Sequence, residues 1–158
     1  MNTRTILGGL ALVAGTSTAG LAQTATQVVS FQVQGINRLS FSGSPSILIN
    51  DAVAGNAPTS ASASGSWALT TNQTNQKVTA SIGSAMPSGL TLSANLVAPS
   101  GATSSTQPLG TVAVDVVTGI TKLNTSGLGV TYTLDATSDA GVVALTSRTV
   151  TYTLTTGA

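Results

Sequence analysis

Residues 149–154 have the sequence TVTYTL, in which large apolar side chains alternate with threonine. This alternation is typical of a β-strand with one buried face, because successive side chains of a strand point to opposite sides. The pentapeptide VTYTL at 150–154 also occurs at 130–134. Both copies are expected to present Val, Tyr and Leu to one side of a sheet, and residues 135–148 would then connect them as a long hairpin.

The same period of two recurs along the chain, and no ten-residue stretch shows the 3.6-residue period of a helix. Turn-forming Gly, Pro, Asn and Ser clusters separate the segments. The sequence therefore predicts an all-β fold, a single antiparallel β-sandwich of about eight or nine short strands of the immunoglobulin-like kind, with a closed barrel as the lesser alternative. The other predicted strands have their apolar positions at Val29, Phe31 and Val33; Leu39 and Phe41; Ile47, Leu48 and Ile49; Trp67 and Leu69; Val78, Ala80 and Ile82; Leu90, Leu92, Ala94 and Leu96; and Val112, Val114 and Val116.

The first 22 residues have the features of an export signal. Arg4 precedes a short apolar run, and the segment ends in small residues at Gly20 and Ala22. This pattern predicts a signal peptide over 1–22, cleaved between Ala22 and Gln23, and a sandwich domain over 23–158. The apolar run is short for a membrane span. We therefore expect a bacterial protein that is secreted to the extracellular space or the cell surface, without a stable membrane span after cleavage.

The charge pattern narrows the range of partners. Residues 23–158 contain four basic and four acidic side chains, so their formal net charge is zero, and 42 of them are Ser or Thr. Binding to nucleic acid or anionic lipid requires clustered Lys and Arg, which this chain lacks. A neutral, hydroxyl-rich surface favours association with other copies. The expected partners are the protein itself, through sheet edges, or other envelope proteins, and no nucleic acid.

The residue inventory argues against catalysis. The chain has no His, Cys or Glu, so the common general base, the thiolate nucleophile and the usual transition-metal ligands are all missing. Nothing surrounds Lys77 or Lys122 with the motif of a Ser-Lys dyad. We expect no enzymatic activity, no catalytic residues and no cofactor. Asp135 and Asp139 carry oxygens that suit calcium, but a solvated turn is the favoured interpretation of this segment.

Aromatic side chains bear on carbohydrate binding, because sugar sites commonly stack rings on exposed aromatic faces. Trp67 is in phase with Leu69, and Tyr132 and Tyr152 are in phase with Val and Leu. All three are therefore predicted to belong to the core.

Three stretches carry a resemblance to known proteins: Val28-Val29-Ser30-Phe31-Gln32-Val33, Met86-Pro87-Ser88-Gly89-Leu90-Thr91-Leu92, and Arg148-Thr149-Val150-Thr151-Tyr152-Thr153-Leu154-Thr155. The chain resembles small exported bacterial β-sandwich proteins of largely unknown function, broadly similar to fimbrial subunits and spore-coat-type secreted proteins. The resemblance implies a role at the cell surface, as a subunit of a fibre or coat. Fimbrial subunits that assemble through a chaperone commonly carry a disulfide and a donor extension. This chain has no Cys and only Gln23 to Gln27 before its first expected strand, which counts against chaperone-dependent assembly.

Two functional interpretations remain open. The first is a non-catalytic structural subunit that associates through sheet edges, with Val29, Phe31 and Val33 as the face of a donated strand. Pairing of that strand within its own domain is the more ordinary outcome. The second is an adhesion or carbohydrate-binding module that uses the loops at 51–65 and 99–108.

Overall fold

The structure is a computed structural model that describes residues 22–157. The predicted signal peptide lies almost wholly outside the described residues, and Ala22 and Gln23, which flank the expected cleavage point, are exposed. The chain divides into two units between Gln32 and Val33, and all the strands lie in the second unit. Across 22–157 we find no helix with the length and apolarity needed to cross a membrane.

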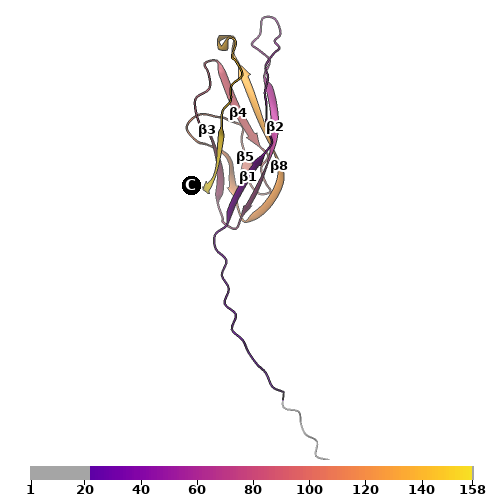
Figure 1. The fold of residues 1–158 in the computed structure, drawn as a ribbon, viewed down its shortest axis with the longest axis vertical. Helices are drawn as coiled ribbons and strands as arrows, with labels where there is room; N and C mark the ends of the chain where they lie inside the picture. The colour runs from indigo at the N-terminus through magenta and orange to yellow at the C-terminus, as the bar shows by residue number, and fades with distance from the viewer. Residues whose placement is uncertain (1–21, 158) are drawn as a thin grey trace, which may run out of the picture. The chain divides into compact units, whose positions relative to one another are not determined.

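The second unit is an antiparallel β-sandwich, so the predicted fold class is confirmed (Figure 1). Strands β1, β2, β8, β4 and β6 form one sheet in that order, and β5, β7, β3 and β9 form the other. A one-turn 3₁₀ helix, η1 (Ser138–Ala140), is the sole helical element in the described part of the chain. The strands are β1 (Asn37–Ser42), β2 (Ala61–Thr71), β3 (Gln76–Ile82), β4 (Leu90–Leu96), β5 (Thr103–Ser104), β6 (Gln107–Pro108), β7 (Val114–Ile120), β8 (Leu123–Ala136) and β9 (Val150–Thr156).

The alternating sequence determines which side of each strand faces the core. In β3, Val78, Ala80 and Ile82 are buried, while the intervening side chains are partly exposed. On the outer face of the same sheet, Lys77 Nζ lies 3.1 Å from the carboxylate of Asp115 on β7. Asp115 therefore points to solvent. This pair is exposed enough that it adds little stability.

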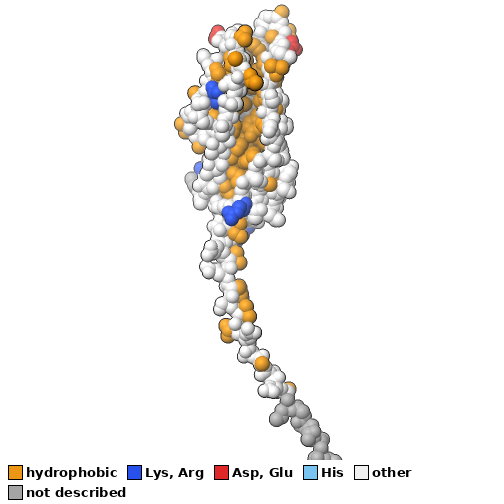
Figure 2. Space-filling view, viewed as in Figure 1, with side chains coloured by type: hydrophobic (Ala, Val, Ile, Leu, Met, Phe, Trp, Pro, Cys, Tyr) orange, Lys and Arg blue, Asp and Glu red, His pale blue; other side chains and the backbone are white. Residues whose placement is uncertain are grey.

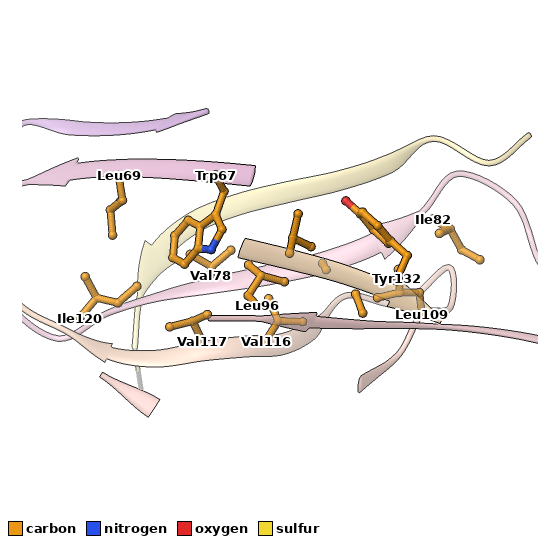
Figure 3. Close-up of a cluster of buried hydrophobic side chains, with 13 residues drawn as sticks. Trp67, Leu69, Val78, Ile82, Leu96, Leu109, Val116, Val117, Ile120 and Tyr132 are labelled. Atoms are coloured by element: carbon orange, nitrogen blue, oxygen red, sulfur yellow. The ribbon is translucent and has the colours of Figure 1, made fainter. Parts of the chain in front are cut away.

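The core lies between the two sheets (Figure 3). Trp67 and Leu69 from β2 meet Val78 from β3 and Leu96 from β4 there, so the prediction of a buried Trp67 is confirmed. The indole Nε1 of Trp67 is the one buried side-chain polar atom without a hydrogen-bond partner among the described residues. The buried hydrophobic side chains are those of Trp67, Leu69, Val78, Ala80, Ile82, Ala94, Leu96, Leu109, Val116, Val117, Ile120, Val130 and Tyr132.

The predicted hairpin between the two VTYTL segments is wrong. Residues 130–134 lie in β8 of the first sheet and residues 150–154 in β9 of the second sheet, so the segments face each other across the sandwich. Their tyrosines meet there, and the hydroxyl of Tyr152 donates a hydrogen bond of 2.9 Å to the hydroxyl of Tyr132. The two segments therefore contribute to one interior from opposite layers.

Two predicted strands and parts of both predicted loops also differ from the structure, since the loop predicted at 99–108 contains β5 and β6. Residues 29–33 and residues 47–49 belong to no strand, whereas residues 61–65, predicted as part of an Ala/Ser-rich loop, form the first half of β2. Residues 61–65 pair with residues 130–134 of β8. A small side chain suffices at these positions because β8 supplies the ladder hydrogen bonds and the bulk.

Candidate functional site: an apolar edge cavity and an unpaired tail

One edge of the sandwich is open. β1 and β9 are the last strands of their sheets at this edge, so each pairs with a neighbour on one side and has a free ladder edge on the other. Hydrophobic side chains form an exposed strip on the face of the sandwich where these two strands lie (Figure 1, Figure 2). A free edge beside exposed apolar surface is a ready template for an additional strand.

A cavity of about 1140 Å³ opens at this edge, and we call it the edge cavity. The space is open to solvent and is large enough to accept several side chains of a partner. Its lining includes Phe41 from β1, Leu92 from β4, Tyr132 from β8, Val150 and Tyr152 from β9, Met86, and the segments at 45–52 and 136–148.

Aromatic rings form the floor of the edge cavity. Phe41 stacks on Tyr152 with ring centroids 3.8 Å apart and on Trp67 with centroids 6.0 Å apart. The first stack spans the two sheets, because Phe41 belongs to β1 and Tyr152 to β9. The rings are thus engaged with one another, and the faces that a sugar platform would present are largely occupied. Tyr132 is buried and Tyr152 is half-buried, as predicted for core aromatics.

The Tyr152 hydroxyl is strongly perturbed. Burial raises the pKa of Tyr152 far above its ordinary value of 10.0, and the hydrogen bond that it donates to Tyr132 raises this pKa further. Both effects favour the neutral phenol. The cavity floor therefore remains uncharged at any physiological pH, which suits an apolar occupant.

Two segments without strand structure form the mouth of the cavity. One runs from Ser44 to Asn50 after β1, and the other from Val142 to Ser147 before β9. Arg148 closes the second segment by donating hydrogen bonds to the carbonyl oxygens of Ala85 and Ser147, at 3.1 and 2.8 Å. These bonds hold the arginine head against the backbone, and its positive charge lies at the border of an otherwise mainly apolar lining.

The tail, residues 22–33, has the pattern of a strand without being one. Val29, Phe31 and Val33 are 73%, 93% and 78% exposed, and no residue of the tail takes part in a sheet. With a period of two, these three side chains lie on one side of the extended chain, which we call the donor face, while Ser30 and Gln32 lie on the other. A segment that served only as a linker would be polar.

The base of the tail is fixed to the sandwich. The Ile36 amide donates a 2.8 Å hydrogen bond to Asn72 Oδ1, and Asn72 Nδ2 donates one of 2.8 Å to the carbonyl oxygen of Gln34. Gly35 lies between them, where a Cβ would approach Gln73 Nε2 to 2.9 Å. The chain therefore enters β1 in a defined direction, set by an asparagine side chain at the start of the β2–β3 connection.

The donor face and β9 have matching spacings. Val29, Phe31 and Val33 are spaced two residues apart, and so are the inward-facing Val150, Tyr152 and Leu154 of β9. In a β-ladder, residues two apart on one strand lie opposite residues two apart on the other. Three donor side chains, spanning about 13 Å, would thus align with three inward positions of the free edge.

The remaining sequence candidates are not brought together. Asp135 accepts a hydrogen bond from Ser60, and among residues 22–157 there is no cluster of three potential metal ligands that includes it or Asp139. The predicted loop at 51–65 contributes only Asp51, Ala52 and Pro58 to the edge cavity. The other predicted loop, 99–108, contains the short edge strands β5 and β6 and does not line the cavity. The two loops therefore form no common surface there.

No family model, curated protein or solved structure matches this chain. Its function must therefore be inferred from the geometry of the cavity and the tail. Sequence reasoning singled out Val29, Phe31 and Val33 but did not predict the cavity, because the lining comes from four strands and three connecting segments that are far apart in the chain. The Ile-Leu-Ile run at 47–49, which lies outside any strand, was the one local signal of an apolar site.

Proposed function

We propose that copies of this protein assemble by donating a strand to one another, as non-catalytic structural subunits of a fibre or coat outside the bacterial cell. The tail of one copy lies along the free edge of β9 in the next copy. Val29, Phe31 and Val33 enter the edge cavity of that copy, and the tail backbone continues its ladder. The assembly needs no cofactor and no partner other than the chain itself.

One observation carries this proposal: the same chain holds an exposed apolar strand pattern and an unfilled apolar cavity beside a free strand edge. The tail of one copy would fill the cavity of another copy, and the cavity would bury the exposed apolar side chains of that tail. The cavity is lined mainly by apolar side chains, and the inward-facing residues of β9 that line it, Val150 and Tyr152, are two residues apart, as are the side chains of the donor face. Burial of each donor side chain would contribute about 1.5–3 kcal/mol, because all three are largely exposed in the single chain.

The fixed base of the tail supports donation to another copy over insertion into the tail's own domain. Donation in cis would require the chain to reverse between Val33 and Asn37, where β1 begins. The hydrogen bonds of Asn72 to Gln34 and Ile36 hold that short connection in place. A reversal there would break both bonds, each of which contributes about 0.5–1.5 kcal/mol.

The surface charge is compatible with close packing of many copies. Basic and acidic side chains are equal in number after residue 22, and no run of like charge borders the cavity, whose lining includes Asp51 and Arg148. Neighbouring copies would therefore not repel one another.

Complementation between two disabled chains tests the proposal. Phe31→Asp in residues 23–158 disables the tail and leaves the cavity intact, while Val150→Asp disables the cavity and leaves the tail intact. Each variant alone should sediment as a monomer, and an equimolar mixture should form a one-to-one heterodimer. The unchanged chain should form larger assemblies visible by negative-stain electron microscopy.

A control substitution on the opposite side of the tail tests whether assembly depends on the donor face. Gln32→Asp places the same charge on the opposite side of the tail, so this variant should still assemble. Circular dichroism checks that every variant is folded. If the mixture remains monomeric, or if Gln32→Asp abolishes assembly as fully as Phe31→Asp does, strand donation is the wrong mechanism.

Adhesion or carbohydrate binding has weaker support. The stacked rings of Phe41 and Tyr152 leave little aromatic face free for a sugar, and the loops at 51–65 and 99–108 do not converge at the cavity. Binding of the unassembled Phe31→Asp chain to a glycan array would favour this alternative.

A further inference from the structure

We infer that the segment Ser44–Asn50 is a displaceable plug, which fills the entrance of the edge cavity in the free subunit and leaves it when the donor strand arrives. The inference rests on the proposed function and adds a regulatory element to the same site. The plug follows β1 directly and ends where a small hairpin begins at Asp51.

The side chains of the plug differ alternately in burial. All three residues line the cavity, but Ile47 and Ile49 are half-buried, whereas Leu48 between them is 71% exposed. Ile47 also packs against the buried core cluster. This is the arrangement of a strand with one buried face, and it imitates on a smaller scale the alternation of the donor face.

The plug has no ladder to hold it. Among the described residues, none from 44 to 50 belongs to a strand or forms a backbone–backbone hydrogen bond. The adjacent hairpin contrasts with it, because the Thr59 amide donates a 2.8 Å hydrogen bond to the Asp51 carbonyl and the Asn56 amide donates one of 2.9 Å to Val53. Segments with few buried contacts and no backbone pairing open at low free-energy cost. The plug can therefore leave the cavity without unfolding its neighbours.

The donor strand has two advantages over the plug. A cavity of about 1140 Å³ remains with Ile47 and Ile49 in place, so the plug fills only part of the available space. The donor brings three side chains, including the larger Phe31, and its backbone can pair with the free edge of β9. The plug thus shields apolar surface in the free subunit and lowers the affinity of that subunit for non-specific partners, while the donor strand still displaces the plug.

A peptide-binding experiment measures the competition. The receptor is residues 23–158 with Phe31→Asp, so that its own tail cannot donate, and the ligand is a fluorescent peptide of residues 24–34. Adding Ile47→Ser and Ile49→Ser should raise the association rate and the affinity, together amounting to about tenfold tighter binding. The control Leu48→Ser alters the most exposed of the three side chains, and it should change the affinity much less than the isoleucine changes do.

A second measurement follows the plug without weakening it. The chain has no cysteine, so Ile47→Cys in the Phe31→Asp receptor introduces a single thiol at the cavity entrance. The half-buried thiol should react slowly with an alkylating reagent in the free receptor and severalfold faster once the peptide is bound. If the double serine variant fails to fold, this alkylation rate still shows whether the plug leaves the cavity when the peptide binds.

The outcomes separate the inference from the proposed function. If the peptide binds the parent receptor but the serine variants bind it equally or more weakly, and the introduced thiol becomes slower to alkylate, then residues 44–50 form a wall that grips the donor and the plug is refuted. If the peptide binds no receptor at all, the proposed strand donation fails and the plug fails with it.

Discussion

Replacement of Phe31 by alanine should weaken donation without affecting the free subunit. Phe31 is 93% exposed in the single chain, so the variant loses no native packing and its free energy of unfolding should be unchanged. In the complex the same ring would be buried in the edge cavity. Because the cavity exists before binding, only the transfer free energy of the ring is lost, about 2–3 kcal/mol. The dissociation constant should therefore rise by about 30- to 140-fold.

The heterodimer of the two disabled chains provides the assay. The donor partner is residues 23–158 with Val150→Asp, with or without Phe31→Ala, and the receptor partner carries Phe31→Asp. Isothermal titration calorimetry gives the dissociation constant of each pair. Gln32→Ala in the donor is the matched control, and it should change the constant by less than about threefold.

Either of two results would refute this reasoning. Binding of the Phe31→Ala donor within twofold of the parent would mean that the ring does not enter the cavity. Equal losses for Phe31→Ala and Gln32→Ala would mean that the tail binds without a preferred face.

Three further predictions concern the sandwich itself. The pKa of Tyr152 is raised in the folded chain and ordinary in the unfolded chain, so the stability that its neutral form provides is complete below pH 10. Above pH 10 this stability falls by about 1.4 kcal/mol per pH unit. Urea titrations at pH 9 and 11 should show the loss, and the variant Tyr152→Phe should lose less stability over the same pH range. Leu96→Ala should lower the free energy of unfolding by about 2–5 kcal/mol because Leu96 is fully enclosed, and Leu48→Ala at an exposed site should change it by less than about 0.5 kcal/mol in urea denaturation. Asn72→Ala removes the acceptor of the Ile36 amide, so hydrogen exchange at Ile36 should quicken about fivefold, and an unchanged rate would show that this bond does not hold the tail base.

The sequence predicted most of the strands whose alternation involves large side chains, but residues 29–33 and 47–49 form no strand, because no neighbouring strand pairs with them. The strand predicted over 90–96 coincides with β4, and the Val, Tyr and Leu of 150–154 face inward from β9 as expected. Local alternation reports which side of a strand is buried, since that property depends on neighbouring residues. It predicted Ala61 to Gly65 poorly, because small side chains there carry no apolar signal and the strand exists through its pairing with β8.

The identity of each strand's partner was beyond the local pattern. The repeated VTYTL suggested a hairpin, yet its copies lie in different sheets. Alternation predicts which side of a strand is buried, but it does not predict which strand pairs with it. For the candidate site, Val29, Phe31 and Val33 were predictable as one face. The edge cavity was not, because it arises where β1 ends at Ser42 while β4, β8 and β9 continue beyond it.

The attachment of Gln34 and Ile36 to Asn72 has a mechanical consequence. In an assembly of the proposed kind, only Gln34 and Gly35 separate the donated segment from the domain that supplies it, so tension would pass from one subunit to the next with little slack. The donated strand would lie lengthwise along β9, and ladder hydrogen bonds run perpendicular to the strands. Tension would therefore load all of these bonds together in shear, and would not open them one after another. The breaking strength of such a fibre would depend on the length of the donated strand more than on the stability of the sandwich.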